Sequence, residues 1–152
     1  MSAPLTRIIL CGKTAAIGRG VIAGLKPQVE VIRFVSSLNQ ANNEIPLILS
    51  GQYKNLPEVT KGEEILGTQN FNRIPDAVML GGGYSKQDFE QIQKTCLDTP
   101  KAKAVPFFLA DTTLPAPPLG PEYGKAMTNR AKDALEKWRL NLTGNTTGPI
   151  WY

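Results

Sequence analysis

The sequence contains no histidine, and its two cysteines, Cys11 and Cys96, lie far apart. Without histidine the chain has no Ser-His-Asp or Cys-His catalytic machinery and no histidine-ligated metal site. Two distant cysteines do not suit a structural zinc either, so we expect no metal. They are expected to be reduced thiols rather than a disulfide. Any acid–base chemistry would therefore have to use Asp, Glu, Lys, Tyr or Cys.

The sequence also lacks long apolar runs and clustered charge. No apolar stretch approaches the roughly 18 residues of a membrane span, and residues 1–7 lack the apolar core of a signal peptide. These absences predict a cytoplasmic protein with no membrane partner. The net charge is +4, but the basic residues are scattered. Because nucleic-acid binding needs a basic cluster, we expect no nucleic-acid partner.

The length and composition are typical of one globular domain. The chain has 152 residues, of which 41% are apolar and 20% are charged, enough for a normal core. We expect one Rossmann-like domain over residues 1–152, with residues 144–152 as a C-terminal tail. The tail ends in Ile150-Trp151-Tyr152, which is too apolar to lie free in water. It is expected to pack on its own domain or on the second subunit of a homodimer.

Apolar runs alternate with helical patterns along the chain. The predicted strands are Thr6–Cys11, Val29–Val35, Asp76–Leu80 and Ala104–Leu109. The first predicted helix is about Ile17–Leu25, and the last starts at Pro121. A third is capped by Ser85 with Asp88. Residues Ile45–Gly51 are predicted to form a short helix with Pro46 at its first position, and a short strand is the alternative. This alternation is typical of a parallel sheet with right-handed crossovers. Pro106 has no backbone N–H to donate to a neighbouring strand, which favours an edge position for the fourth strand. The expected architecture is a three-layer α/β fold, Rossmann-like or flavodoxin-like, with about four strands in the order 2-1-3-4 and helices on both faces.

Three finer expectations accompany this outline. Residues 39–43 are polar and are predicted to form a turn. Residues 51–75 have the least regular pattern, which suggests a functional lid or a mobile loop, or else a short helix around Glu63–Leu66. The apolar face of the helix after Ser85 is expected to consist of Phe89, Ile92, Cys96 and Leu97.

Two glycine-rich loops follow predicted strands. Gly12–Gly18 comes after the first strand, and Gly81-Gly82-Gly83 follows the third. Ligands of open α/β sheets bind at the carboxyl ends of the strands, where the strand order reverses. The order 2-1-3-4 brings both loops to that crevice. Their convergence predicts a small-ligand site, while the other interpretation is that the glycines only permit tight turns.

The residues Cys11-Gly12-Lys13-Thr14-Ala15-Ala16-Ile17-Gly18 resemble the Thr-Gly-x-x-x-Gly-x-Gly turn of short-chain dehydrogenases. In that family the turn holds the cofactor pyrophosphate, so the resemblance implies NAD or NADP and backbone contacts from Gly12, Ile17 and Gly18. The Gly81–Gly83 loop is similar in placement to that family's loop after its fourth strand. The family's Tyr-x-x-x-Lys pair is absent, and the chain is shorter than such an enzyme.

Taken whole, the chain resembles small single-domain Rossmann-like proteins of filamentous fungi without settled function. This resemblance rests on Ile8–Lys13 and on Pro117–Met127.

The crevice suggests specific residues for binding and catalysis. The candidate cofactor-binding residues are Gly12, Lys13, Thr14, Ile17, Gly18, Ser36, Gly81, Gly82 and Gly83. Tyr84 and Asp111 would flank the crevice as acid and base, with a helix-entry aromatic and a turn aspartate as the structural alternatives. Cys11 lies beside Lys13 near a helix N-terminus, which can lower a thiol pKa, although a cysteine at a strand end is more often a small buried residue.

Three hypotheses about function follow. The first is a Rossmann-like domain that binds a nucleotide or another small ligand in the crevice, with a minor pathway enzyme as one form of it. The second is a non-catalytic structural or interaction module that acts as a homodimer without a nucleotide. The third is a cofactor-free isomerase or cyclase.

Overall fold

The computed structural model describes residues 5–58, 66–141 and 148–152. They contain a five-stranded parallel sheet in the order β2-β1-β3-β4-β5. The strands are β1 (Thr6–Cys11), β2 (Val29–Val35), β3 (Ala77–Leu80), β4 (Phe107–Leu109) and β5 (Ile150–Trp151). The helices are α1 (Ala15–Leu25), α2 (Leu38–Leu49), the short 3-10 helix η1 (Tyr53–Asn55), α3 (Lys86–Leu97) and α4 (Pro121–Arg139). Within these residues no helix is long and apolar enough to cross a membrane.

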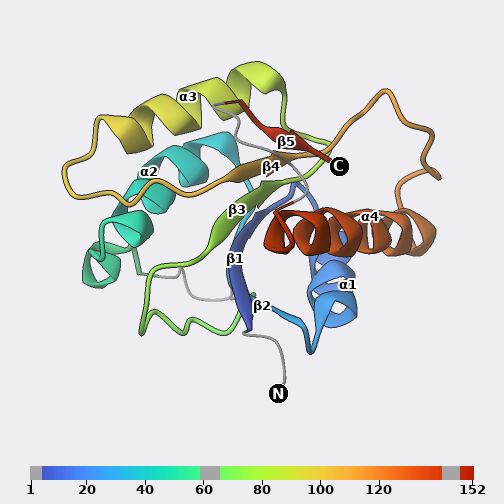
Figure 1. Cartoon of the computed structure of the whole chain (residues 1–152), viewed down its shortest axis with the longest axis horizontal. Coiled ribbons are helices and arrows are strands. Elements are labelled where there is room, and N and C mark those ends of the chain that lie inside the picture. Colours follow the sequence, from blue (N-terminus) through green and yellow to red (C-terminus); the bar gives the residue numbers. More distant parts are fainter. Residues whose placement is uncertain (1–4, 59–65, 142–147) are drawn as a thin grey trace.

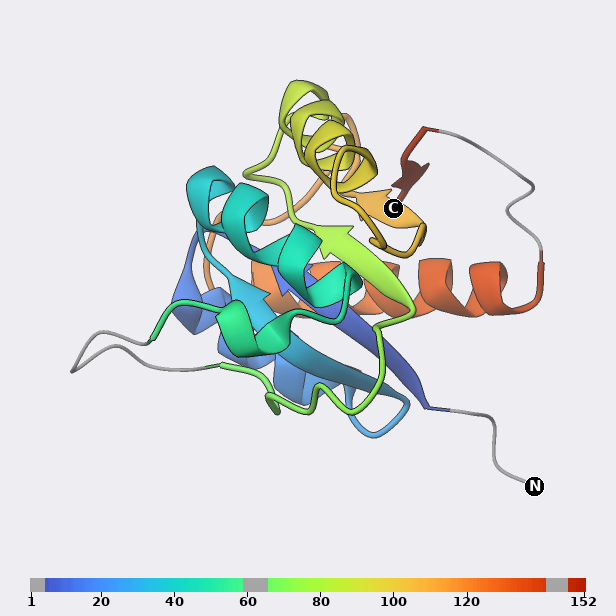
Figure 2. The ribbon, with the colours of Figure 1, turned by 90° about the vertical axis from the view of Figure 1, so that its left-hand side faces the viewer.

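The helices cover both faces of the sheet, which gives three layers. α2 and α3 lie on one face, and α1 and α4 lie on the other (Figures 1 and 2). Successive residues of a buried strand serve opposite faces. In β1, Ile8 and Leu10 join the core under α1 and α4, whereas Ile9 and Cys11 join the core under α2 and α3. The predicted fold class and the order 2-1-3-4 are confirmed, and a fifth strand is added.

Local signals set most element boundaries. β1 and β2 have the predicted bounds, because both are apolar toward both faces of the sheet. Ser85 and Asp88 form the predicted capping box at the start of α3. Leu97 was expected on the buried face of α3, but this is wrong: it is 73% exposed, because it points about 100° around the helix from the buried Cys96.

The second helix differs from the expectation. The predicted turn at residues 39–43 is instead part of α2, which starts at Leu38. The physical reason is the cap, because the Ser37 hydroxyl accepts a hydrogen bond from the Gln40 amide at 3.0 Å. Pro46 therefore lies inside the helix rather than at its first position.

The edge prediction for β4 is also wrong. β5 pairs with β4 in parallel, with Phe108 opposite Ile150 and Leu109 opposite Trp151. Pro106 lies just before β4, so its missing amide does not interrupt the ladder. Residues 150–152 of the tail pack on their own domain, where Tyr152 is buried against the same sheet; residues 144–147 lie outside the described residues.

Part of the irregular segment protects the other sheet edge. The Phe34 amide donates to the Leu66 carbonyl oxygen at 3.2 Å, and the Gln69 amide donates to the Ile32 carbonyl oxygen at 2.9 Å. Gly67 lies between them with a φ of +101°, and a Cβ there would be 2.7 Å from the Ile32 oxygen. Residues 66–69 thus cover the β2 edge instead of forming a lid. Residues 63–65 of the alternative helix lie outside the described residues.

Candidate functional site

The two glycine loops meet at the carboxyl ends of β1 and β3. These strands are parallel neighbours, with Cys11 opposite Leu80. The Gly81 amide donates to the Cys11 carbonyl oxygen at 2.9 Å. A Cβ on Gly83 would lie 2.5 Å from Cγ of Lys13, so the stem of this lysine crosses the second loop. The crevice inferred from strand order therefore exists.

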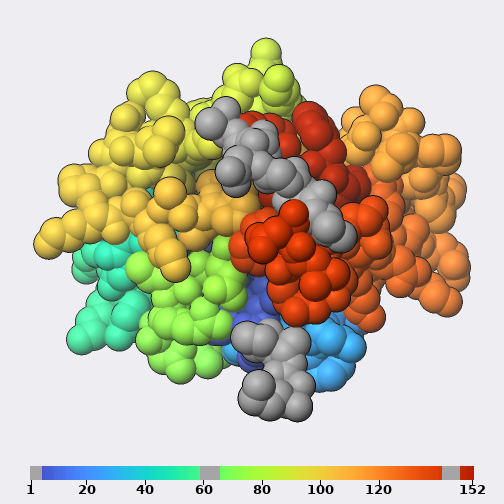
Figure 3. All heavy atoms as spheres, in the orientation of Figure 1, coloured from blue at the N-terminus to red at the C-terminus, as the bar shows by residue number. Residues whose placement is uncertain are grey.

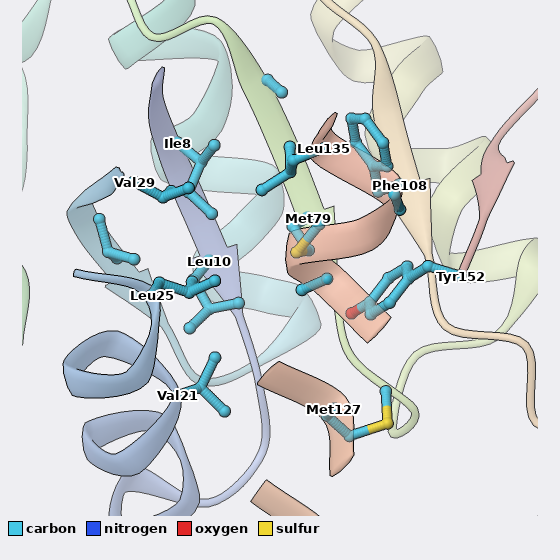
Figure 4. Packing of buried hydrophobic residues seen from close by; sticks show 14 of the residues in the cluster. Ile8, Leu10, Val21, Leu25, Val29, Met79, Phe108, Met127, Leu135 and Tyr152 are labelled. Carbon is cyan, nitrogen blue, oxygen red and sulfur yellow. The ribbon is translucent and has the colours of Figure 1, made fainter. Parts of the chain in front are cut away.

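A cavity of about 140 Å³ lies between these loops and α4. Its walls come from β1, α1, β2, β3, α4 and the residue after β5. Five of the lining residues are labelled in the core of Figure 4: Leu10, Val21, Met79, Met127 and Tyr152. The lining residues are Leu10, Cys11, Gly12, Lys13, Thr14, Ile17, Gly18, Val21, Phe34, Met79, Gly81, Gly83, Leu119, Tyr123, Met127, Ala131 and Tyr152. Most of these side chains are apolar, and the exposed ones, such as Lys13, Gly83 and Leu119, mark the mouth.

Most of the predicted binding residues line this cavity. They are Gly12, Lys13, Thr14, Ile17, Gly18, Gly81 and Gly83. Ser36 does not line it, and its amide and hydroxyl both contact Oε1 of Gln40, at 2.9 and 3.2 Å. Gly82 does not line it either, and a Cβ there would come within 2.6 Å of the Tyr123 hydroxyl oxygen. Ser36 is thus a local helix-start residue, and Gly82 makes room for a tyrosine.

Sequence reasoning missed the aromatic and sulfur-containing walls. Tyr123 and Met127 come from α4, Met79 from β3 and Tyr152 from the end of the described chain. In Figure 4 the Tyr152 ring points from the β4–β5 side toward Met79 and Met127. Met79 and Met127 carried a signal, since Met79 lies in an apolar run typical of a buried strand and Met127 lies on the apolar face of its helix. The apolar chain end predicted that Tyr152 would pack but did not say where, because its place depends on β5.

Tyr152 is held by both its backbone and its hydroxyl group. The hydroxyl donates to the Leu80 carbonyl oxygen at 2.9 Å. The Tyr152 backbone oxygen accepts from the Asp111 amide and from Arg130, each at 2.6 Å. In the space-filling view, the chain end lies against the loop that contains Asp111 (Figure 3). These bonds fix one wall of the cavity.

Two of the glycines make room for an aromatic ring. A Cβ on Gly18 would lie 2.5 Å from Cε2 of Phe34, and one on Gly12 would lie 3.1 Å from the same atom. Phe34 is buried in β2. Internal packing therefore requires small residues at Gly12 and Gly18.

Cys11 is not an activated thiol. It is fully buried and packs in the core under α2 and α3. Burial is the main cause that raises its thiol pKa, Glu44 adds to the rise, and Lys13 opposes it. The expectation of a lowered pKa is therefore wrong, and the interpretation as a small buried residue holds.

Tyr84 is a structural aromatic rather than an acid at the cavity. Its side chain is 2% exposed and packs in the core under α2 and α3. Its hydroxyl donates to the carbonyl oxygens of Gly12 at 3.3 Å and Val35 at 3.4 Å. Burial raises its pKa, and the Lys13 ammonium lies 4.3 Å from its ring centroid. Tyr84 thus joins β2 to the first glycine loop.

Asp111 is the turn aspartate of the structural alternative. Its carboxylate accepts from the Thr113 hydroxyl at 2.6 Å and from the Thr113 amide at 3.0 Å. These bonds lower its pKa. It does not line the cavity. Within the described ranges, no group of three or more His, Cys, Asp or Glu residues is placed to hold a metal ion.

Comparison with known proteins gives one informative relative. No family model matches the chain, and no solved structure matches it. It is 33% identical over 132 residues to the protein named kojic acid related protein 6 of Aspergillus oryzae, with 86% of this chain and 76% of that protein covered. The chain belongs to the family of this fungal protein. The match agrees with the fungal resemblance in the sequence and names no dehydrogenase family.

Proposed function

We propose that the protein binds a compact molecule, about the size of a single ring, in the cavity between the glycine loops and α4. The observation that carries this proposal is a volume of about 140 Å³ within mainly apolar walls. An engineered apolar cavity of about 150 Å³ holds benzene, whereas pockets for drug-sized ligands are usually about 300–1,000 Å³. The volume supports a single-ring ligand rather than a whole dinucleotide.

The distribution of polarity suggests how such a ligand lies. Leu10, Val21, Met79 and Met127 line the cavity and are buried, so they would contact the apolar face of a ring. The mouth is formed in part by exposed Lys13 and by other residues of the loops. A ring would bury its carbon framework and turn charged or strongly hydrated substituents toward this opening.

The name of the fungal relative supplies a first probe. It associates that protein with kojic acid, a compound with one oxygen-containing ring that carries carbonyl and hydroxyl groups. A molecule of this kind suits the size of the cavity. Kojic acid is therefore the first ligand to test, together with 4-pyranone and toluene as simpler rings and with NAD and NADP as the nucleotide alternatives.

The methionine methyl groups provide the assay. The chain has three methionines, and two of them, Met79 and Met127, line the cavity. With ¹³C-labelled methionine methyl groups, single-ring compounds should shift the Met79 and Met127 signals in a saturable way. NAD and NADP should give no comparable saturation.

A pair of alanine substitutions controls for specificity. Ala131 and Ala134 are both buried in α4, but Ala131 lines the cavity and Ala134 does not. Ala131→Val should weaken binding by reducing the cavity, whereas Ala134→Val should retain it in folded protein. If no single-ring compound shifts either methyl signal, the proposal fails and the interpretation as a structural homodimer gains support.

A further inference from the structure

We propose that Tyr123 selects, among compact ligands of this cavity, those that carry a carbonyl-type hydrogen-bond acceptor. This inference rests on the proposed function, because it assigns the polar contact made by the ligand. It names both a specificity-determining residue and a chemical feature of the ligand.

The position of Tyr123 places its hydroxyl at the carboxyl end of β3. It lies in the first turn of α4 and lines the cavity. Its hydroxyl oxygen is 2.6 Å from the point where Gly82 would carry a Cβ. Any side chain at Gly82 would displace this hydroxyl. The central glycine of the second loop therefore leaves room for the hydroxyl of a residue that lines the cavity.

The Tyr123 hydroxyl is available to donate a hydrogen bond to a ligand. Two other tyrosines near this end of the sheet use their hydroxyls internally, Tyr152 on the Leu80 carbonyl oxygen and Tyr84 on two backbone oxygens. Within residues 5–58, 66–141 and 148–152, no hydrogen bond is formed by the Tyr123 hydroxyl. A phenol O–H donates one hydrogen bond, and a carbonyl oxygen is an acceptor that suits it.

The remaining polar groups of the lining are placed less well for this contact. The Lys13 ammonium lies on the Tyr84 ring, and Tyr84 packs under the opposite face of the sheet. Thr14 is exposed at the mouth, where water competes for its hydroxyl. Tyr123 is half-buried, so a ligand in the cavity would shield its hydroxyl from water.

This arrangement should discriminate between rings of equal size. A ring without an acceptor would cover the Tyr123 hydroxyl and leave its donor unpaired, which opposes binding. A ring with a carbonyl oxygen replaces the lost water contact. For this reason, binding sites that offer a hydrogen-bond donor reject analogues that have no acceptor for it.

The test compares 4-pyranone with toluene, which have the same number of heavy atoms. Their dissociation constants are measured with the methionine methyl signals for the wild type and for Tyr123→Phe. We expect Tyr123→Phe to weaken 4-pyranone binding by roughly three- to tenfold, the range of a net hydrogen bond. Toluene should bind this variant as well as, or better than, it binds the wild type.

The control is Tyr53→Phe, because Tyr53 is exposed in η1 and stacks on Phe71 away from the cavity. It should change neither constant. If Tyr123→Phe weakens both ligands equally, or neither, the hydroxyl does not select acceptors, and the inference is overturned while the binding function stands. If neither compound binds the wild type, both proposals fail.

Discussion

Replacing Gly18 with alanine should destabilise the protein, although alanine is the better helix former. Gly18 and Gly20 both lie inside α1. A Cβ on Gly20 meets no atom within 4 Å, whereas one on Gly18 meets Phe34 Cε2 at 2.5 Å. The two positions thus share a helix and differ in what faces them. Gly20→Ala is the matched control for Gly18→Ala.

The magnitudes follow from two opposing terms. Alanine stabilises a helix interior by about 0.5–1 kcal/mol relative to glycine, so Gly20→Ala should gain about that much. At Gly18 the Phe34 ring must move about 1 Å to restore an ordinary carbon–carbon distance of roughly 3.5 Å. Overpacking of a core typically costs about 1–3 kcal/mol. The net loss for Gly18→Ala should therefore be up to about 2.5 kcal/mol.

Urea unfolding measures both variants, with the same dependence on urea concentration expected for each. The smaller side chain in Phe34→Leu should remove most of the penalty in the double variant Gly18→Ala/Phe34→Leu, which a double-mutant cycle would detect. If Gly18→Ala is as stabilising as Gly20→Ala, Phe34 does not occupy the space beside Gly18. The packing explanation of the glycine motif would then be refuted.

Three further predictions concern buried polar groups. Arg33 and Glu44 form an ion pair at 2.8 Å, and their side chains are 11% and 6% exposed. Arg33→Met should therefore lower the free energy of unfolding by about 3–5 kcal/mol, and the double variant Arg33→Met/Glu44→Gln should recover much of that loss. A loss below about 1 kcal/mol for Arg33→Met would mean that Glu44 is well solvated. Burial raises the thiol pKa of Cys11 and raises that of Cys96 to about 12. Both thiols should therefore resist alkylation at pH 8 until urea unfolds the chain. Because the unfolded thiols ionise near the ordinary pKa of 9.0 while the folded ones stay protonated, stability should also fall as the pH rises above that value; stability that rises there in urea titrations would contradict this assignment.

The elements that the sequence predicted well are those with local signals. β1 and β2 are apolar toward both faces, and the start of α3 carries its own capping box. The start of α2 was missed because one serine hydroxyl outweighs the polar composition of residues 39–43. β5 was missed because a two-residue strand has no periodicity and exists only through its pairing with β4.

The sequence by itself determined the alternation of strands and helices, and hence a parallel sheet with two glycine loops at its carboxyl edge. Tertiary structure decided what those glycines are for. Gly18 faces Phe34 and Gly82 faces Tyr123, and neither partner is near its glycine in the chain. The cavity depends equally on distant pairs, since the Tyr152 hydroxyl reaches the Leu80 carbonyl oxygen 72 positions away. A glycine motif specifies space for close approach, and only the folded chain specifies which group occupies that space.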